Sequence, residues 1–367
     1  MKQCICLFIF IVLTSCQTVL PPPPTTLPTP HVVIETVTPL PTVTDVPTAS
    51  LTPYPFLIYP YTIQGLREHQ FQSGTITILS TLETTGEYTR YSISYPSDGL
   101  TITGILQIPS GQGPFPVIVM NHGYFNRSEY QSGSGSDRAA EFLVKHGYIT
   151  LASDYRSWGG SDIGSSLFHT GLVVDVINLM NAIPSIPRAD PDRIGMWGHS
   201  MGGGITTKIL TIDSRVKAAV LYAPNSADDA DLIARWGYGC IGDIATGEAL
   251  ETCNSGDIVP LTLPPDLIEA YKEAAYDPTM LQQIAPIYHL DLITAPIQIH
   301  IGTADGDFIG STPPEWSYKL NQALLDAGRD VQLYKYEGER HSFIGDQWLL
   351  FMSRAVEFFD THVKSIQ

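Results

Sequence analysis

The sequence predicts an α/β fold with a mostly parallel central sheet, helices on both faces and a small cap insertion. Short apolar runs alternate with helical patterns from residue 116 to residue 364, as expected of parallel strands joined by crossover helices. The run at 116–120 is continuously apolar, which is typical of a strand buried on both faces. A Gly-x-Ser-x-Gly pentapeptide at 198–202 stands between an apolar run and a helical pattern, and this order predicts a tight strand-to-helix turn.

The first 16 residues resemble the signal of a bacterial lipoprotein. Lys2 gives a minimal basic region, and the apolar run at 5–13 is too short to span a bilayer comfortably. The letters LTSC at 13–16 resemble a lipobox, whose cysteine becomes the lipidated first residue of the mature protein. The resemblance implies lipidation of Cys16 and an extracytoplasmic, membrane-anchored protein. The alternative is an ordinary signal peptide with an incidental cysteine.

Residues 17–60 are predicted to be a disordered linker. Twelve of them are Pro and ten are Thr, with almost no charge. Such a composition buries too little apolar surface to order itself and favours an extended, polyproline-like chain. The sequence therefore predicts one folded domain over residues 61–367 on a tether.

Strands and helices follow in order within that domain. The first three predicted strands form an antiparallel lead-in, since the letters PSDG at 96–99 predict a turn between two of them. The predicted strands are 75–79, 88–95, 100–108, 116–120, 148–152, 193–197, 217–222, 297–301 and 331–336. The predicted helices are 137–146, 172–180, 205–210, 315–327 and 347–364.

Residues 225–290 break the alternation and are predicted to form a cap over the carboxyl edge of the sheet, where α/β proteins place their sites. Within the cap, Cys240 and Cys253 are predicted to form a disulfide in an oxidising compartment; two free buried thiols are the alternative. Its aromatic residues line a substrate pocket or form the core of the cap, and they include Trp236, Tyr238 and Tyr271.

Charge and metal-binding patterns exclude two classes of function. The formal net charge of −17 argues against nucleic-acid binding, which requires clustered Lys and Arg. The sequence has no HExxH motif and no closely spaced His pair, so no metal or other cofactor is predicted. The acidic residues Asp228, Asp229 and Asp231 are interpreted as a solvated loop or a helix start.

Three residues are predicted to form a catalytic triad. Ser200, at the centre of the pentapeptide, is the nucleophile and needs a base that is itself oriented by an acid. His341 follows the last strand and is predicted to be the base; His289, His300 and His362 are interpreted as structural. The acid is predicted to be Asp305, at the end of strand 297–301, with Asp307 as the alternative.

Two donors are predicted to form an oxyanion hole. One is the backbone N–H of Met201, the residue after the nucleophile. The other comes from the loop at 122–124, which reads His-Gly-Tyr. The backbone N–H of Tyr124 is favoured there, and its hydroxyl remains open.

These motifs together resemble the catalytic domain of the prolyl oligopeptidase family and the related dienelactone-hydrolase-like esterases. The resemblance covers residues 88–364. It rests on the letters GHSMGG at 198–203, HG at 122–123, GTAD at 302–305, DYR at 154–156 followed by GGS at 159–161, SDGL at 97–100, AP at 285–286 and the His341 loop. It implies the α/β-hydrolase fold and the triad Ser200, Asp305 and His341. Asp154 and Arg156 are interpreted as structural support.

The sequence departs from that family in two respects. Residues 61–87 are too few to form the β-propeller of the oligopeptidases, and the loop at 122–124 lacks a Gly-Gly form. The predicted function is therefore a serine hydrolase of a small-molecule ester or short peptide, with an esterase favoured and a serine-type peptidase as the alternative. A non-catalytic binding module and other chemistries of the fold, such as a lyase or an acyltransferase, are further alternatives. The oligomeric state is not predicted.

Overall fold

The structure, a computed structural model, describes residues 54–242 and 253–365. The predicted signal peptide, Cys16 and most of the predicted linker lie outside the described residues. The strands are β1 (Thr77–Thr84), β2 (Tyr88–Ser97), β3 (Leu100–Pro109), β4 (Phe115–Asn121), β5 (Ile149–Ser153), β6 (Ala189–His199), β7 (Val216–Tyr222), β8 (Gly239–Gly242), β9 (Asn254–Pro260), β10 (Ile297–Gly302) and β11 (Val331–Tyr336). The helices are α1 (Tyr54–Ile58), α2 (Ile63–Glu68), α3 (Asp137–Lys145), α4 (Thr170–Ala182), α5 (Met201–Leu210), α6 (Asp229–Trp236), α7 (Pro265–Ala274), α8 (Pro278–Ile284), α9 (Pro314–Asp326) and α10 (Gly345–Phe359).

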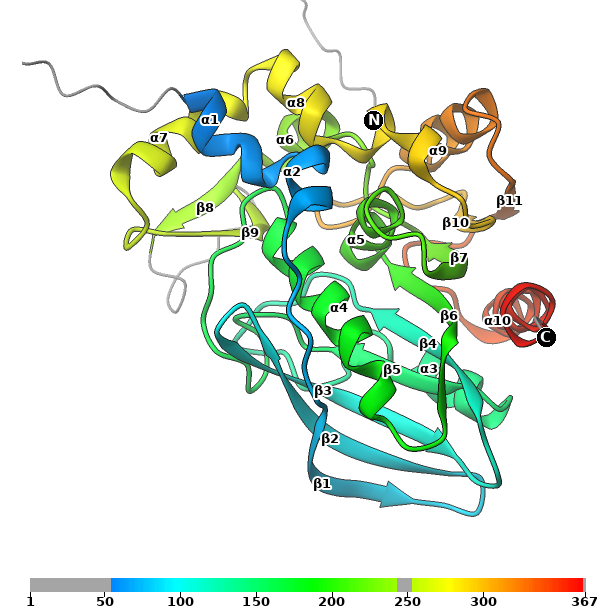
Figure 1. Ribbon diagram of the computed structural model, residues 1–367. Coiled ribbons are helices and arrows are strands. Elements are labelled where there is room, and N and C mark those ends of the chain that lie inside the picture. Colours follow the sequence, from blue (N-terminus) through cyan, green and yellow to red (C-terminus); the bar gives the residue numbers. More distant parts are fainter. Residues whose placement is uncertain (1–53, 243–252, 366–367) are drawn as a thin grey trace, which may run out of the picture. The chain divides into compact units, whose positions relative to one another are not determined.

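Nine strands form one sheet in the order β1-β2-β3-β5-β4-β6-β7-β10-β11 (Figure 1). The pairs that involve β1, β2 and β3 are antiparallel, whereas β5-β4-β6-β7-β10-β11 run parallel. The predicted antiparallel lead-in and parallel sheet are therefore confirmed. Because the parallel strands point the same way, their carboxyl ends share one edge, and the loops after β4, β6, β10 and β11 all meet there.

Helices cover both faces of the sheet. On one face, α4, α5 and α9 pack their apolar side chains against residues such as Val119, Met196 and Ile299. On the other face, α3 and α10 pack against residues such as Met120 and Val220. Alternate residues of β4 thus belong to different cores, as the continuous apolar run at 116–120 predicts.

The predicted cap lies between β7 and β10. It holds α6, the two-stranded β8-β9 sheet, α7 and α8, and these elements have an apolar core of their own that contains Tyr271 and, partly buried, Tyr238. A disulfide joins Cys240 to Cys253, as one of the two alternatives predicts. Asp228 and Asp229 are each 5% exposed, so the solvated-loop alternative is wrong. The helix-start alternative is confirmed, because α6 begins at Asp229 and Asp228 caps it by accepting from Ala230 N–H.

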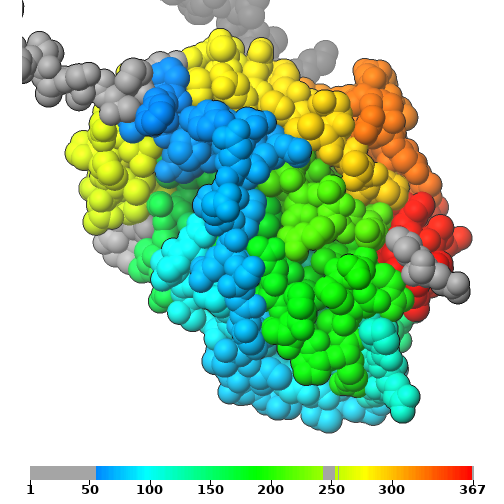
Figure 2. Space-filling model, viewed as in Figure 1, coloured from blue at the N-terminus to red at the C-terminus, as the bar shows by residue number. Residues whose placement is uncertain are grey.

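The ordered domain begins before the predicted residue 61. Residues 54–58 form α1, which packs on α7 of the cap, and Ile58 is fully buried. Figure 2 shows the following segment as a strip across the surface toward β1. Backbone N–H groups of Gln72 and Ile76 donate to side chains of Asn178 and Ser185. The prediction of a linker over 17–60 is therefore wrong at its end, because the cap covers the apolar side chains of this short helix.

A buried ion pair fixes α4 to the loop after β5. Asp175, which is fully buried, accepts hydrogen bonds from Arg156 Nε (3.0 Å), Arg156 Nη2 (2.8 Å) and the Arg156 backbone N–H (2.8 Å). Ser97 Oγ donates to the same carboxylate at 2.6 Å. Asp175 thus satisfies four donors from two other segments, which agrees with the interpretation of Arg156 as structural.

We predict that Asp175→Ala lowers the free energy of unfolding by about 3–5 kcal/mol, since it leaves a buried guanidinium without its partner. The matched control is Glu141→Ala, which removes the exposed pair with Lys145 on α3 and costs about 0.5 kcal/mol or less. Urea unfolding of both variants measures the difference. Equal losses would contradict the structural role given to Asp175.

Candidate active site

Ser200 lies at the sharp turn between β6 and α5. Its backbone has φ 55° and ψ −121°, a region that non-glycine residues rarely adopt. The turn is crowded: a Cβ on Gly198 would strike the carbonyl oxygen of Gly202, and a Cβ on Gly202 would strike that of Asn121. Glycine is therefore required on both sides of Ser200, as the pentapeptide predicts.

Asp305 and His341 meet beside this turn. His341 Nδ1 lies 2.9 Å from Asp305 Oδ2. The Asp305 carboxylate also accepts from Gly306 N–H at 2.7 Å and from Thr312 Oγ1 at 3.0 Å. With Nδ1 on the carboxylate, the Nε2 nitrogen of His341 is available to act as a base. Asp307, the alternative acid, instead forms an ion pair with Arg340 at 3.1 Å on the surface.

The two predicted oxyanion donors come from different elements. Met201 is the first residue of α5, where backbone N–H groups are free and the helix dipole favours negative charge. The loop that contains Tyr124 passes directly against the nucleophile, since a Cβ on Gly123 would lie 3.1 Å from Ser200 Cβ. Tyr124 also packs edge-to-face on Trp158, with ring centroids 6.3 Å apart.

Asp154 stabilises the loop after β4 through hydrogen bonds to its side chains. Its carboxylate accepts from Thr103 Oγ1 (2.6 Å), Tyr130 Oη (2.9 Å) and Ser132 Oγ (2.5 Å). His122, at the start of the loop, stacks between two tyrosine rings at 4.6 and 4.3 Å. Burial lowers the pKa of His122. These contacts agree with the interpretation of Asp154 as structural support.

His199 is a functional candidate that sequence reasoning missed. Its Nε2 lies 3.0 Å from the carbonyl oxygen of His341, and the two imidazole centroids are 4.8 Å apart. Burial, and next the neighbouring His341, lowers the pKa of His199 to about 3. His199 is therefore neutral at neutral pH, and its N–H can donate to the loop that carries the base. The pentapeptide identifies its position, but only the fold shows its partner.

A cavity of about 530 Å³ opens onto Ser200 and His341, a size typical of sites for small molecules. Aromatic side chains form much of its wall, contributed by Tyr124, Phe125, Trp236 and Phe308. Trp236 thus lines the pocket, whereas Tyr238 and Tyr271 belong to the cap core. His169 and Asn225 also line the cavity, and no sequence motif marks either of them.

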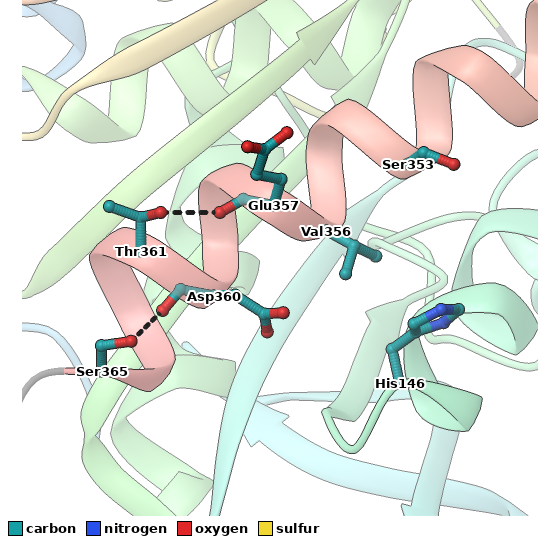
Figure 3. Close-up of a pocket in the computed structure, with 7 residues that line it drawn as sticks. All are labelled: His146, Ser353, Val356, Glu357, Asp360, Thr361 and Ser365. Carbon is teal, nitrogen blue, oxygen red and sulfur yellow. Dashed lines mark hydrogen bonds between the residues drawn. The ribbon is translucent and has the colours of Figure 1, made fainter.

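A second hollow of about 380 Å³ lies on the surface beside the end of α10 (Figure 3). His146 and Asp360 are among its lining residues, and it contains none of the predicted site residues. It is shallow and open, so the cavity beside Ser200 is the better candidate for a binding site. Within the described residues, no group of three or more His, Cys, Asp or Glu side chains is arranged to hold a metal ion.

Known proteins resemble parts of this chain. Residues 112–286 match the family model described as serine aminopeptidase, S33. A polyketide transferase of Stachybotrys chlorohalonatus is 33% identical over 132 residues, 35% of this chain and 42% of that protein. The esterase FrsA of Shigella boydii is 28% identical over 133 residues, 34% of this chain and 29% of FrsA. The chain thus matches less than half the length of these relatives.

A solved structure matches more of the chain. Acetyl xylan esterase 1 from a Thermoanaerobacterium species superposes with a TM-score of 0.54 at 17% identity, over 83% of this chain and 93% of the esterase. That level of identity supports the fold alone. Together with the sheet order and the turn at Ser200, this superposition shows that the chain has the α/β-hydrolase fold.

Proposed function

We propose that the protein is a serine hydrolase that cleaves a carboxylic ester through an acyl-enzyme. The observation that carries the proposal is the 2.9 Å contact between His341 and Asp305 at a cavity that also exposes Ser200. A serine hydroxyl is a poor nucleophile unless a base takes its proton as it attacks. Ser200, His341 and Asp305 supply the nucleophile, the base and the group that orients the base.

In the proposed reaction, Ser200 Oγ attacks the ester carbonyl carbon while His341 Nε2 takes its proton. The oxyanion that forms accepts from the Met201 N–H and from the Tyr124 N–H; one such donor contributes roughly 3 kcal/mol of transition-state stabilisation. His341 then returns the proton to the alcohol, which leaves. Water, deprotonated by His341, releases the acid from Ser200 and restores the free enzyme.

An ester is favoured over a peptide because an amide needs a site that binds and protonates a much poorer leaving group. The prolyl oligopeptidases that the sequence resembles carry a β-propeller for peptide selection, and the structure has no propeller within residues 54–242 and 253–365. The aminopeptidase description of the matching family model favours the second candidate, a serine-type peptidase. The esterase and the peptidase differ in the leaving group that the site accepts, an alcohol or an amine.

We also propose that the protein is extracytoplasmic and held at a membrane by a lipid on Cys16. The signal-like residues 1–16 support this, and so does the disulfide between Cys240 and Cys253, since disulfides persist in oxidising compartments. Within the described residues, no helix is long and apolar enough to cross a membrane.

We predict that the 54–367 domain hydrolyses p-nitrophenyl esters of short acids and leaves aminoacyl p-nitroanilides intact. Ser200→Ala is expected to lower kcat/KM for the esters by at least about 10⁴-fold, since the nucleophile is lost. Comparable turnover of anilides would support the peptidase instead. Unchanged ester turnover in the variant would refute the proposed mechanism.

The orienting acid gives a prediction with a matched control. Asp305→Asn is expected to slow labelling of Ser200 by a fluorophosphonate by about 10³–10⁴-fold, because the wrong tautomer of His341 is then favoured. Asp307→Asn, two residues away on the surface, is expected to change the rate less than about twofold. Labelling rates follow from gel fluorescence over time. If Asp307→Asn slowed labelling much more than Asp305→Asn, Asp307 would be the orienting acid instead.

Lipid anchoring predicts a change in fractionation. When the full chain is expressed in a bacterium, we expect it to fractionate with the membrane. We also expect it to become labelled with an alkynyl fatty acid. Cys16→Ala is expected to lose both properties, because a single thiol carries the lipid. The proposed anchor would be contradicted if the wild-type protein carried no fatty acid. It would also be contradicted if the Cys16→Ala variant were still labelled.

A further inference from the structure

Two strained residues precede α4 at the wall of the cavity. Phe168 has φ 51° and His169 has φ 60°, both in the left-handed region that non-glycine residues rarely adopt. Such strain persists only where the surroundings enforce it. Strain of this kind concentrates at functional sites, and His169 lines the cavity beside Ser200.

Three buried side chains from different elements enforce this conformation. Asp257 of β9 accepts from Phe168 N–H at 3.0 Å and from His169 N–H at 2.7 Å. Tyr271 Oη of α7 donates to the same carboxylate at 2.6 Å. Lys208 Nζ of α5 donates to the Phe168 carbonyl oxygen at 2.8 Å. Each of the three side chains is at most 3% exposed, so the arrangement is rigid.

The imidazole of His169 has one nitrogen toward this network and one toward the cavity wall. Nδ1 lies 3.7 Å from Asp257 Oδ1. Nε2 lies against Gly256, where an added Cβ would strike it and would also lie 3.1 Å from Met201 Sδ. Gly256 therefore allows the imidazole to pack closely against β9, near Met201, the residue that follows Ser200.

Asn225 adds a second polar group to the same cavity. It is 5% exposed, and its Oδ1 has no hydrogen-bond partner among the described residues. A buried amide oxygen without a partner is costly. Asn225 follows β7, on the opposite side of β6 from β5 and His169. His169 therefore supplies a polar group on its own side of a cavity whose walls include Tyr124, Phe125 and Trp236.

Sheet order indicates which part of an ester meets His169. The β5 strand leads to α4 and His169, β11 leads to His341, and these two strands lie on opposite sides of β6. Since His341 must protonate the leaving alcohol, that alcohol lies on the His341 side. The acyl group then lies on the side of His169. The carboxylates of Asp257 and of Asp229, which lies beside Lys208, are on the His169 side. Their negative charge disfavours an anionic acyl group there.

We propose that His169 is a specificity-determining residue that hydrogen-bonds a hydroxyl on the acyl group, and that the substrates are esters of hydroxyaryl acids. This rests on the proposed esterase function and names its substrate class. The aryl ring packs between the aromatic side chains of the cavity, and the hydroxyl reaches the imidazole. A neutral hydroxyl suits this site because it both donates and accepts, whichever ring nitrogen of His169 carries the proton.

The test compares methyl cinnamate with methyl 3-hydroxycinnamate and methyl 4-hydroxycinnamate. The wild-type protein is expected to have a kcat/KM at least about tenfold higher for one of the hydroxylated esters, as one hydrogen bond allows. His169→Asn, chosen because Asn tolerates the left-handed region, is expected to bring that ratio close to one. Gly256→Ala is expected to do the same by displacing the imidazole.

The matched control is His146→Asn, an exposed histidine at the end of α3 that does not line the cavity; it is expected to keep the wild-type ratio. Turnover of p-nitrophenyl acetate by each protein reports Ser200 chemistry separately. If the wild type cleaves that acetate but cleaves the three methyl esters equally or not at all, the inference is wrong and the esterase proposal stands. An unchanged ratio in both folded variants, verified by circular dichroism, would also overturn it. A wild type inactive on the acetate as well would overturn the esterase proposal and this inference together.

Discussion

The backbone of Ser200 is the constraint on which the rest of the site depends. Its positive φ reverses the chain between β6 and α5, and backbone hydrogen bonds hold it there. Ser200 N–H donates to Tyr222 O at 3.0 Å, and Ser200 O accepts from Gly203 N–H and Asn225 N–H, each at 2.9 Å. The turn exposes the hydroxyl at the cavity and starts α5 at the next residue. The proposed nucleophile and one proposed oxyanion donor therefore come from one strained turn, whose strain is balanced by contacts with β7 and the loop after it.

The parallel sheet brings the other groups to this turn. Asp305 and His341 are far from Ser200 in sequence, but each follows a parallel strand whose carboxyl end lies at the same edge. His199 then links the nucleophile turn to the base loop through the His341 carbonyl. Because its pKa is lowered to about 3, His199 adds no charge beside His341 at neutral pH. In the proposed reaction, the positive charge that develops is thereby confined to the His341 imidazole, which Asp305 contacts.

Local signals predicted most of the fold and the site. The apolar run at 116–120, the turn at 96–99 and the pentapeptide depend on neighbouring residues, and the structure shows the corresponding elements. Asp305 also followed from a local argument, its position at a strand end. The helix at 54–58 was missed because its burial depends on α7, more than two hundred residues later. His169 was missed for the same reason: Asp257 from the cap enforces its conformation, and nothing in residues 165–169 indicates it.

Trapping of the acyl-enzyme tests the central claim most directly. The domain is mixed with a p-nitrophenyl ester, quenched in acid within milliseconds, and measured by intact mass and peptide mapping. The account predicts that the protein gains the mass of the acyl group, on the peptide that contains Ser200, at the rate at which p-nitrophenol first appears. Product formation without a covalent adduct, or an adduct on another residue, would contradict it.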